Sequence, residues 1–383
     1  MKSLKSVIIS GGGTGGHINP ALAIADEIKR RYPEVKINFV GAVGRMEMQK
    51  VPAAGYKIDG LWISGVDRKI TSVRNFIFPL KLISSLIKAG RLLRKYKPEV
   101  VIGVGGFASG PILFRASKKN IPTLIQEQNS FPGITNRILA KKVDKVCAGF
   151  PGLNRWFPED RISYTGNPLR SGVLKIAEHG GDKVVAANHF DFNSDKPIVF
   201  IMGGSLGALS MNLAVKNLLE YYSDRDDLPY QILWQCGARH LNDNDVWLKE
   251  FKRKNGEFAK QIKCVGFIDR MDLAYASSDI IASRAGAMSI SELAIIAKPT
   301  LLIPSPHVTE DHQTKNALSL VERGAAVLID DVEVVMKLRE EIESLLQNDT
   351  LCSSMSAALK SAAKPEACMK IVDEIESLLK LNL

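Results

Sequence analysis

The stretch "SGGGTGGHINPAL", residues 10–22, follows the apolar run "SVIIS" and precedes a helical pattern that starts near Pro20. A strand, a glycine loop and a helix N-terminus in this order predict an anion site. Glycine lets backbone N–H groups approach a ligand, and the helix end adds partial positive charge. Residues 11–16 also spell G-x-G-x-x-G, the dinucleotide fingerprint. The stretch therefore predicts an α/β fold with a phosphate near this loop, and leaves open which phosphate.

The same pattern repeats along the chain. Apolar runs of four to six residues alternate with helical periodicity, which indicates parallel sheets covered on both faces. The pattern restarts at "PIVFIM", residues 197–202, after a polar segment at about 171–196 that we interpret as a connector. Because 383 residues are too many for one ordinary core, we predict two doubly wound domains, residues 1–166 and 167–383, the second ending in helices. Two such domains facing each other would place a cleft between their ligand-binding edges.

Three loops share the design of the opening stretch. They cover residues 11–16, 105–111 and 203–208, and together they favour phosphate groups over tight turns that merely need glycine. A nicotinamide site also needs an acidic residue at the end of the second strand, and "FVGAVG", residues 39–44, has none. No G-K-[ST] follows any of the loops, so a Walker site is excluded as well.

A histidine stands directly behind the first glycines. We predict Asn19 as the helix N-cap and Pro20 as the first helical residue, which leaves His17 on the loop, facing the ligand. An imidazole with an ordinary pKa near 6.5 can act as a base at neutral pH. The alternative is a histidine that only hydrogen-bonds the loop or a phosphate, and the spacing does not decide between them.

The stretch "SRAGAMSISELA", residues 283–294, predicts a second site. A strand ends at its first residues, a glycine turn follows, and a helix starts near Met288. Ser289 and Glu292 fit an S-x-x-E capping box, while the alternative for Glu292 is a carboxylate that accepts hydrogen bonds from sugar hydroxyls. Downstream, the residues His307, Asp311 and His312 do not have a zinc spacing, so we expect no metal.

The net charge of +10 is concentrated in one segment. Residues 68–97 contain nine Lys or Arg and no Asp or Glu. We predict that Pro79 begins a helix there and that a loop precedes it. The expected apolar stripe consists of Leu82, Ile83, Leu86, Ile87 and Leu93. The residues expected to dock on an anionic lipid surface are Phe76, Ile77, Phe78, Lys81, Lys88 and Arg91. The alternative is an ordinary amphipathic helix on the sheet; nucleic acid is disfavoured, since no recognition module is present.

Other bulk features restrict the class of protein. No apolar run reaches the roughly 18 residues of a membrane-spanning helix, and we expect no secretory signal. Five scattered cysteines indicate a reducing compartment.

In this order, several motifs together resemble the GT-B glycosyltransferases of peptidoglycan synthesis over nearly the whole chain. They are "GGTGGHINPALAIA", "KPEVVIGVGGFASGP", "QEQNSFPGITNR", "GNPLR", "GGSLGA", "GFIDRM", "SRAGAMSISELA" and "DHQTKNA". The resemblance implies two Rossmann-like domains facing across a cleft. The N-terminal domain would bind a lipid-linked acceptor and the membrane, and the C-terminal domain would bind UDP-GlcNAc.

The implied reaction is an inverting transfer of GlcNAc to the 4-hydroxyl of the MurNAc of undecaprenyl-pyrophosphoryl-MurNAc-pentapeptide (lipid I), which gives lipid II. It requires no cofactor or metal. The implied location is the cytoplasmic face of the bacterial plasma membrane, as a peripheral protein, with other cell-wall synthesis proteins as possible partners. Alternatives are another GT-B enzyme, such as a glycolipid glycosyltransferase or a UDP-GlcNAc epimerase, and a nucleotide-binding protein without catalysis.

The resemblance also implies site residues. The UDP-GlcNAc contacts fall on Thr14, Gly15, Gly16, Asn129, Arg170, Ser205, Ile268, Ala287, Met288, Glu292 and Gln313. The acceptor-side loop contains Gly105, Gly106, Ser109 and Gly110. His17 would be the base, Glu292 would bind the ribose, Ile268 would border the uracil, and Ser205 with the helix start at Ala287 would hold the diphosphate. Leu206 departs from the Gln of many relatives, and the loop before Gln313 differs in length from some.

Overall fold

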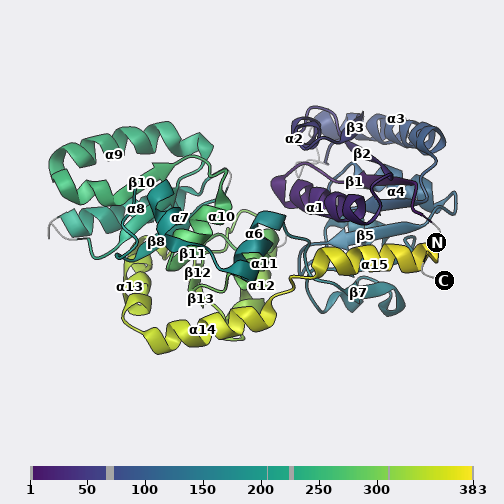
Figure 1. Ribbon diagram of the computed structural model, residues 1–383. Coiled ribbons are helices and arrows are strands. Elements are labelled where there is room, and N and C mark those ends of the chain that lie inside the picture. The colour runs from purple at the N-terminus through teal and green to yellow at the C-terminus, as the bar shows by residue number, and fades with distance from the viewer. Residues whose placement is uncertain (1–2, 66–72, 205, 224–227, 309–310, 382–383) are drawn as a thin grey trace. The chain divides into compact units, whose positions relative to one another are not determined.

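The computed structural model describes residues 3–65, 73–204, 206–223, 228–308 and 311–381. The chain divides into two compact units (Figure 1). The first contains residues 1–170 and 364–383, and the second contains residues 171–363. Each unit holds a parallel sheet with helices on both of its faces, which confirms the predicted α/β class.

The first unit is built on a seven-stranded sheet, counted over the described residues, in the order β3-β2-β1-β4-β5-β6-β7. Its strands are β1 (Ser6–Ser10), β2 (Lys36–Ala42), β3 (Lys57–Leu61), β4 (Val100–Gly103), β5 (Thr123–Glu127), β6 (Lys145–Ala148) and β7 (Ile162–Tyr164). Its helices are α1 (Gly15–Arg31), α2 (Glu47–Ala53), α3 (Val73–Tyr96), α4 (Ser109–Ser117), α5 (Ile134–Leu139) and α15 (Ala367–Leu379). Because the chain order reverses between β1 and β4, the loops after these two strands diverge and leave a ligand position.

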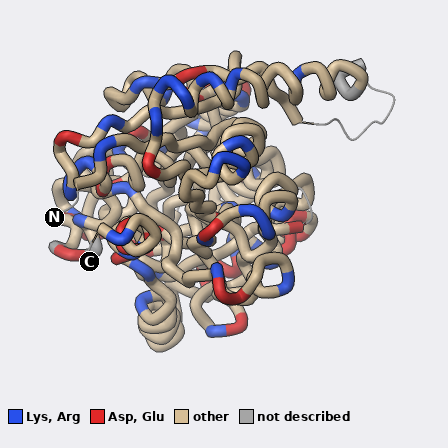
Figure 2. Tube along the Cα trace, turned by 90° about the vertical axis from the view of Figure 1, so that its right-hand side faces the viewer, with Lys and Arg blue, Asp and Glu red and all other residues tan. Residues whose placement is uncertain are grey.

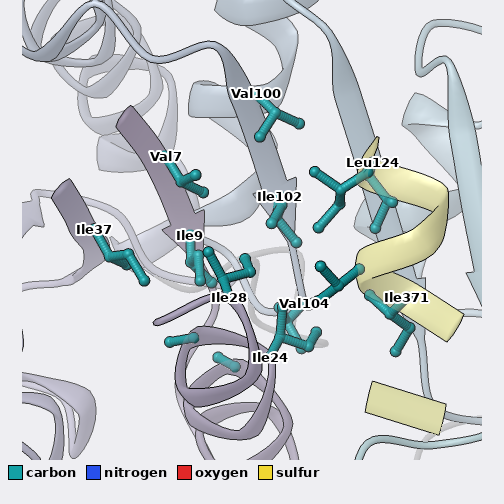
Figure 3. Close-up of a cluster of buried hydrophobic side chains, with 14 of the residues drawn as sticks. Val7, Ile9, Ile24, Ile28, Ile37, Val100, Ile102, Val104, Leu124 and Ile371 are labelled. Carbon is teal, nitrogen blue, oxygen red and sulfur yellow. The ribbon is translucent and has the colours of Figure 1, made fainter. Parts of the chain in front are cut away.

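One face of this sheet carries the core shown in Figure 3. Alternate residues of β1, Val7 and Ile9, meet Ile24 and Ile28, which lie one turn apart on α1. These side chains have at most 1% of their surface exposed, and burying each contributes about 1.5–3 kcal/mol. The opposite face packs against α3, α4 and α5.

The last helix belongs to the first unit, where we predicted the second domain. Ile371, Val372 and Ile375 of α15 are fully buried in the core around α1 (Figure 3). The Arg31 guanidinium at the end of α1 donates to Asp373 at 2.6 Å and to Glu376 at 3.0 Å. The sequence pattern indicates that α15 has an apolar face, but it does not say which sheet that face covers.

The second unit repeats the design with the strand order β10-β9-β8-β11-β12-β13. Its strands are β8 (Ile198–Met202), β9 (Gln231–Gln235), β10 (Ile262–Val265), β11 (Ile280–Ser283), β12 (Thr300–Leu302) and β13 (Val327–Leu328). Its helices are α6 (Ser171–His179), α7 (Lys183–His189), α8 (Leu209–Ser223), α9 (Leu241–Asn255), α10 (Met271–Ser277), α11 (Ala287–Ile296), α12 (His312–Val321), α13 (Val334–Leu346) and α14 (Asp349–Ala362). The reversal of strand order lies between β8 and β11.

Residues 171–196 are not the irregular connector that we predicted. They contain α6 and α7, which pack against α10 and α11 of the second unit. Asp182 caps α7 by accepting a hydrogen bond from the Val185 N–H at 3.0 Å. Helices of nine and seven residues span too few turns to show a clear period in the sequence.

Candidate functional site

In the first unit, the candidate site lies at the carboxyl ends of β1 and β4. The loop after β1 leads into α1, whose N-cap is Thr14, so Gly15, Gly16 and His17 form the first helical turn. The prediction that His17 lies on the loop, before a cap at Asn19, was wrong. The N–H groups of His17 and Ile18 already donate to the Thr14 carbonyl, and Pro20 lies inside the helix.

The two glycine loops of this unit are in direct backbone contact. A Cβ on Gly106 would stand 2.5 Å from the Gly12 carbonyl oxygen. A Cβ on Gly105 would stand 2.7 Å from Cε1 of His17, so the imidazole packs closely against this glycine. The sequence separates these loops by about ninety residues, yet the fold joins them into one surface around the half-buried His17.

A buried carboxylate that we did not predict holds the first loop. Glu47, at the start of α2, has none of its surface exposed. It accepts hydrogen bonds from the N–H groups of Gly13 at 2.8 Å and Ala42 at 2.9 Å. A dinucleotide site would place an acidic residue at the end of the second strand for a ribose. Here the acidic residue lies five positions beyond β2 and binds the glycine loop itself.

Beside His17, a second buried carboxylate shapes the loop after β5. Glu127 accepts from the N–H groups of Asn129 at 3.0 Å and Gly133 at 3.1 Å, and from the Asn136 amide at 2.7 Å. Its side chain thereby fixes Asn129, a predicted donor contact, which is half-buried. The next residue, Gln128, has its amide oxygen Oε1 at 2.9 Å from Nδ1 of His17.

The remaining predicted residues of the first unit have different surroundings. Ser109 is buried, and its hydroxyl donates to the Gly106 carbonyl at 2.8 Å, so it closes the second loop. Gly110 follows it in the first turn of α4. Thr14 is exposed at the start of α1, and Arg170 is exposed at the end of the continuous first segment of this unit.

In the second unit, α11 starts where the strand order reverses. Its N-cap is Gly286, which has no side chain to cap the helix. The first turn begins with Ala287 and Met288 and contains no acidic residue. The predicted capping box was therefore wrong: Ser289 and Glu292 both lie inside the helix. Glu292 is 6% exposed and accepts from the Tyr275 hydroxyl at 2.8 Å.

Arg284, at the end of β11, joins the segments around this helix start. Its guanidinium donates to the carbonyls of Ile303 and Pro304, both at 3.1 Å, to Asp331 at 2.5 Å and to the Ser210 hydroxyl at 2.9 Å. The sequence analysis did not single out this residue, although it is the only basic residue in the stretch 283–294.

The other predicted residues of the second unit lie around the same edge. Ile268 is buried just after β10. Gln313, in the first turn of α12, accepts from the Ser305 N–H at 2.9 Å. Ser205 lies outside the described residues, and the neighbouring Leu206 is 55% exposed.

The basic segment folds differently from the prediction. α3 begins at Val73 with Pro79 inside it, so Phe76, Ile77 and Phe78 are helical. Ile83 and Ile87, which we expected in the core, are 56% and 52% exposed. Leu82 and Leu93 contact the core as predicted, together with Phe78, Ala89 and Leu92.

The outer face of α3 is an apolar stripe that ends in positive charge. Phe76, Leu80, Ile83 and Ile87 recur at helical spacing, and Phe76 is 76% exposed. The exposed Arg91 continues the stripe, and Figure 2 shows the cationic residues along this helix. Lys81 and Lys88 are held by the protein, because their ammonium groups donate to the Ser64 hydroxyl at 3.0 Å and the Gly60 carbonyl at 2.6 Å.

The described ranges contain neither a candidate metal cluster nor a membrane-spanning helix. Within them, no three His, Cys, Asp or Glu side chains gather in a way that could hold a metal ion. Among the same residues, none of the helices combines the length and the apolar character that crossing a membrane requires.

Both halves of the chain match one protein family. The Glycosyltransferase family 28 N-terminal domain matches residues 7–148, and the family 28 C-terminal domain matches residues 198–371. The chain belongs to glycosyltransferase family 28. The residues of both candidate sites fall inside or beside these two ranges.

Named relatives of this family-28 chain match it over nearly its full length. Proteins called UDP-N-acetylglucosamine–N-acetylmuramyl-(pentapeptide) pyrophosphoryl-undecaprenol N-acetylglucosamine transferase are 48% identical in Christiangramia forsetii and 46% identical in Flavobacterium psychrophilum. The first match covers 99% of this chain and 99% of the relative, and the second covers 97% of each. Among solved structures, MurG of Acinetobacter baumannii is 27% identical, with a TM-score of 0.74 over 97% of this chain and 99% of that chain. The predicted GT-B fold is thereby confirmed.

Proposed function

We propose that this chain transfers GlcNAc from UDP-GlcNAc, with inversion, to the 4-hydroxyl of the MurNAc of undecaprenyl-pyrophosphoryl-MurNAc-pentapeptide. The observation that carries the proposal is the position of His17. Its half-buried imidazole stands where the strand order of the first sheet reverses, against Gly105 and beside Gln128. The near-full-length identity to transferases of that name supports the choice of substrates.

The proposed step needs a base and a stabilised leaving group. His17 takes the proton of the acceptor 4-hydroxyl while the hydroxyl oxygen attacks C1 of the donor sugar. The bond from C1 to the UDP oxygen breaks, and the negative charge that UDP gains meets the N–H groups at the start of α11. No acidic residue in the first turn of α11 opposes that charge.

Donor recognition is proposed for the second unit. Glu292, held by the Tyr275 hydroxyl at 2.8 Å, accepts hydrogen bonds from the ribose hydroxyls. Ala287 and Met288 contribute to the diphosphate site, Ile268 borders the uracil, and Gln313 contacts the sugar. Thr14, Gly15, Gly16, Asn129 and Arg170 are the proposed contributions of the first unit, whose glycine loops also bind the acceptor.

We assign docking on an anionic membrane surface to the outer stripe of α3. The stripe combines exposed apolar side chains at Phe76, Leu80, Ile83 and Ile87 with the cationic Arg91. Such a helix inserts its apolar side chains at the headgroup level while its cations meet anionic lipids. Peripheral binding at the cytoplasmic face of the plasma membrane would place the first unit beside a lipid-linked acceptor.

The transfer is tested with purified protein, UDP-GlcNAc and a lipid I analogue, read by mass spectrometry. One added N-acetylhexosamine on the acceptor, and none from UDP-GalNAc, is the expected result. An epimerase would instead convert UDP-GlcNAc without any acceptor. His17→Ala should lower kcat far more than it weakens donor binding, and Glu292→Ala should weaken donor binding; unchanged values would remove those two roles.

Docking is tested by flotation with vesicles that contain phosphatidylglycerol. The triple variant Phe76→Ser, Leu80→Ser, Ile83→Ser should lose vesicle binding and retain activity on a short-chain soluble acceptor. Val246→Ser is the matched control, because Val246 is 69% exposed on α9 and lies off the stripe. Equal flotation of the triple variant and the control would refute the assignment.

A further inference from the structure

The side chain of Gln128 has an unambiguous orientation. It follows β5, is 2% exposed, and its nitrogen Nε2 lies 3.0 Å from the Val104 carbonyl oxygen and 3.0 Å from the Gln126 carbonyl oxygen. Backbone carbonyl oxygens only accept hydrogen bonds, so the group that faces them must be the amide NH2. The amide oxygen Oε1 therefore points the other way, toward Nδ1 of His17 at 2.9 Å.

This orientation determines where the imidazole carries its proton. An amide oxygen cannot donate, so Nδ1 of His17 must be the donor and must be protonated. In the neutral ring the second nitrogen, Nε2, then holds the free lone pair. The other tautomer would place two acceptors, Nδ1 and Oε1, 2.9 Å apart without a hydrogen between them.

A ring of buried amides prevents Gln128 from turning over. Gln126 donates from Nε2 to Oδ1 of Asn167 at 2.9 Å, and Asn167 donates from Nδ2 to the Gln128 carbonyl at 2.9 Å. The side-chain oxygen of Gln126 also accepts from Gln128. A flipped Gln128 would direct its oxygen at three acceptors inside a region that is at most 2% exposed, which leaves buried polar groups unpaired.

We propose that Gln128 is a positioning residue that holds His17 as the Nδ1–H tautomer and so presents Nε2 as the proton acceptor. Its consequence for the rate rests on the proposed function. When the acceptor hydroxyl gives its proton to Nε2, the ring becomes an imidazolium with both nitrogens protonated, and Nδ1–H still donates to Oε1. No proton moves onto the amide, and the proton on Nε2 leaves to solvent before the next cycle.

A neutral partner distinguishes this arrangement from a histidine backed by a carboxylate. A carboxylate on Nδ1 stabilises the imidazolium and favours a ring that keeps its proton. An amide oxygen orients the ring with little of that stabilisation. Gln128 therefore sets the geometry of the base without placing a charge beside it.

The tautomer is tested by long-range ¹H–¹⁵N NMR on the full-length protein with ¹⁵N-labelled histidine, using His17→Asn to assign the His17 resonances. At a pH where the ring is neutral, the expected result is a protonated Nδ1 and an unprotonated Nε2. A protonated Nε2 in the unmodified protein overturns the proposal, whatever reaction the chain catalyses.

Gln128→Met removes both hydrogen-bonding groups at nearly constant volume. We expect a loss of the Nδ1–H signature and a fall in kcat of about tenfold or more, with the donor KM within about twofold. Gln231→Met is the matched control: the side chain of this buried glutamine makes three hydrogen bonds, against four for Gln128, and it lies at the amino end of β9 in the second unit.

The control should leave the His17 spectrum and kcat unchanged. A Gln128→Met variant that keeps the Nδ1–H form, or keeps kcat, overturns the positioning role. If that variant does not fold, the spectrum of the unmodified protein still decides which tautomer His17 adopts. If the spectrum is as expected but no sugar is transferred, the proposed function fails and the tautomer assignment stands.

Discussion

Replacing Gly106 by alanine would separate the two glycine loops of the first unit. Gly106 has φ = +85°, and a Cβ there would lie 2.5 Å from the oxygen and 3.1 Å from the nitrogen of Gly12. Both neighbours are backbone atoms, so no side chain can rotate away to make room. The two loops must move apart by several tenths of an ångström or more, and His17 follows because its ring rests on the adjacent Gly105.

The magnitude has two parts. A left-handed φ costs an L-residue roughly 1–2 kcal/mol, and forcing extra atoms into a packed region adds about 1–3 kcal/mol. Gly55→Ala isolates the first part, because Gly55 has the same φ of +85° and nothing within 4 Å of the added Cβ. The expected loss of unfolding free energy is thus about 2–5 kcal/mol for Gly106→Ala and about 1–2 kcal/mol for Gly55→Ala.

The assay combines urea denaturation with steady-state transfer from UDP-GlcNAc to a lipid I analogue. A misplacement near 1 Å costs up to about a hundredfold in rate, so we expect kcat to fall at least about tenfold in Gly106→Ala. Turnover of Gly55→Ala should stay close to that of the unmodified protein. Equal stability and equal turnover in the two variants would refute the contact between the loops.

Three further perturbations follow from other parts of the fold. Ile371→Ala should reduce the unfolding free energy by about 2–5 kcal/mol, since Ile371 is fully buried in the core of the first unit. Met369 on the same helix is 42% exposed and should tolerate alanine, and urea denaturation compares the two variants. Glu47→Gln should lower the unfolding free energy by about 1–3 kcal/mol and raise the KM for the acceptor, because the NH2 group of the new glutamine would face the N–H of Gly13 or Ala42. An unchanged denaturation midpoint would contradict this role of the Glu47 carboxylate. Burial lowers the pKa of Lys298 from 10.5 to about 8 in the folded protein. As the pH rises, Lys298 therefore loses its proton in the folded protein before it does so in the unfolded chain, and the unfolding free energy rises with pH between those two values. From pH 7 to pH 9.5 the unmodified protein should gain up to ~2 kcal/mol relative to Lys298→Met, and parallel pH profiles would contradict this.

The central strands could be predicted from the sequence, whereas the two edge strands of the first sheet could not. Runs such as "VVIG" of β4 and "IVFIM" of β8 are buried on both faces, so they are continuously apolar. β3, with the sequence "KIDGL", and β7, with "ISY", lie at the two edges of the first sheet and are partly exposed. Their polar residues hide the pattern.

The helix starts at the two sites were hard to predict because this chain makes few side-chain caps. The sequence rules place a helix start at a capping side chain or a proline. α1 begins after Thr14 and α11 after Gly286, and neither position makes a side-chain cap. Several other helices, such as α4, α9 and α13, also start without one, so the rules had no signal at these starts. Asn19 and the pair Ser289–Glu292 were therefore misinterpreted as caps.

Long-range polar contacts were missed because no local pattern encodes them. Glu47 holds a loop 34 residues away, and Gln128 reaches His17 across 111 residues. The sequence did indicate which strand ends would meet, since parallel strands share one edge. It could not indicate which of the polar residues beyond those ends would turn inward to support the loops.

The two sheets use the same backbone design but different electrostatics, which supports the division of roles that we propose. In the first unit, the N–H of Gly13 is already bound by the Glu47 carboxylate, so an anion near that position meets a buried acidic group. In the second unit, the start of α11 has no acidic residue in its first turn, and the cationic Arg284 lies two residues before its N-cap. A leaving diphosphate gains more from the second arrangement, because the helix end favours negative charge, although the charge of Arg284 is already paired with Asp331. A base gains more from the first, because Nδ1 of His17 lies there beside the neutral amide of Gln128.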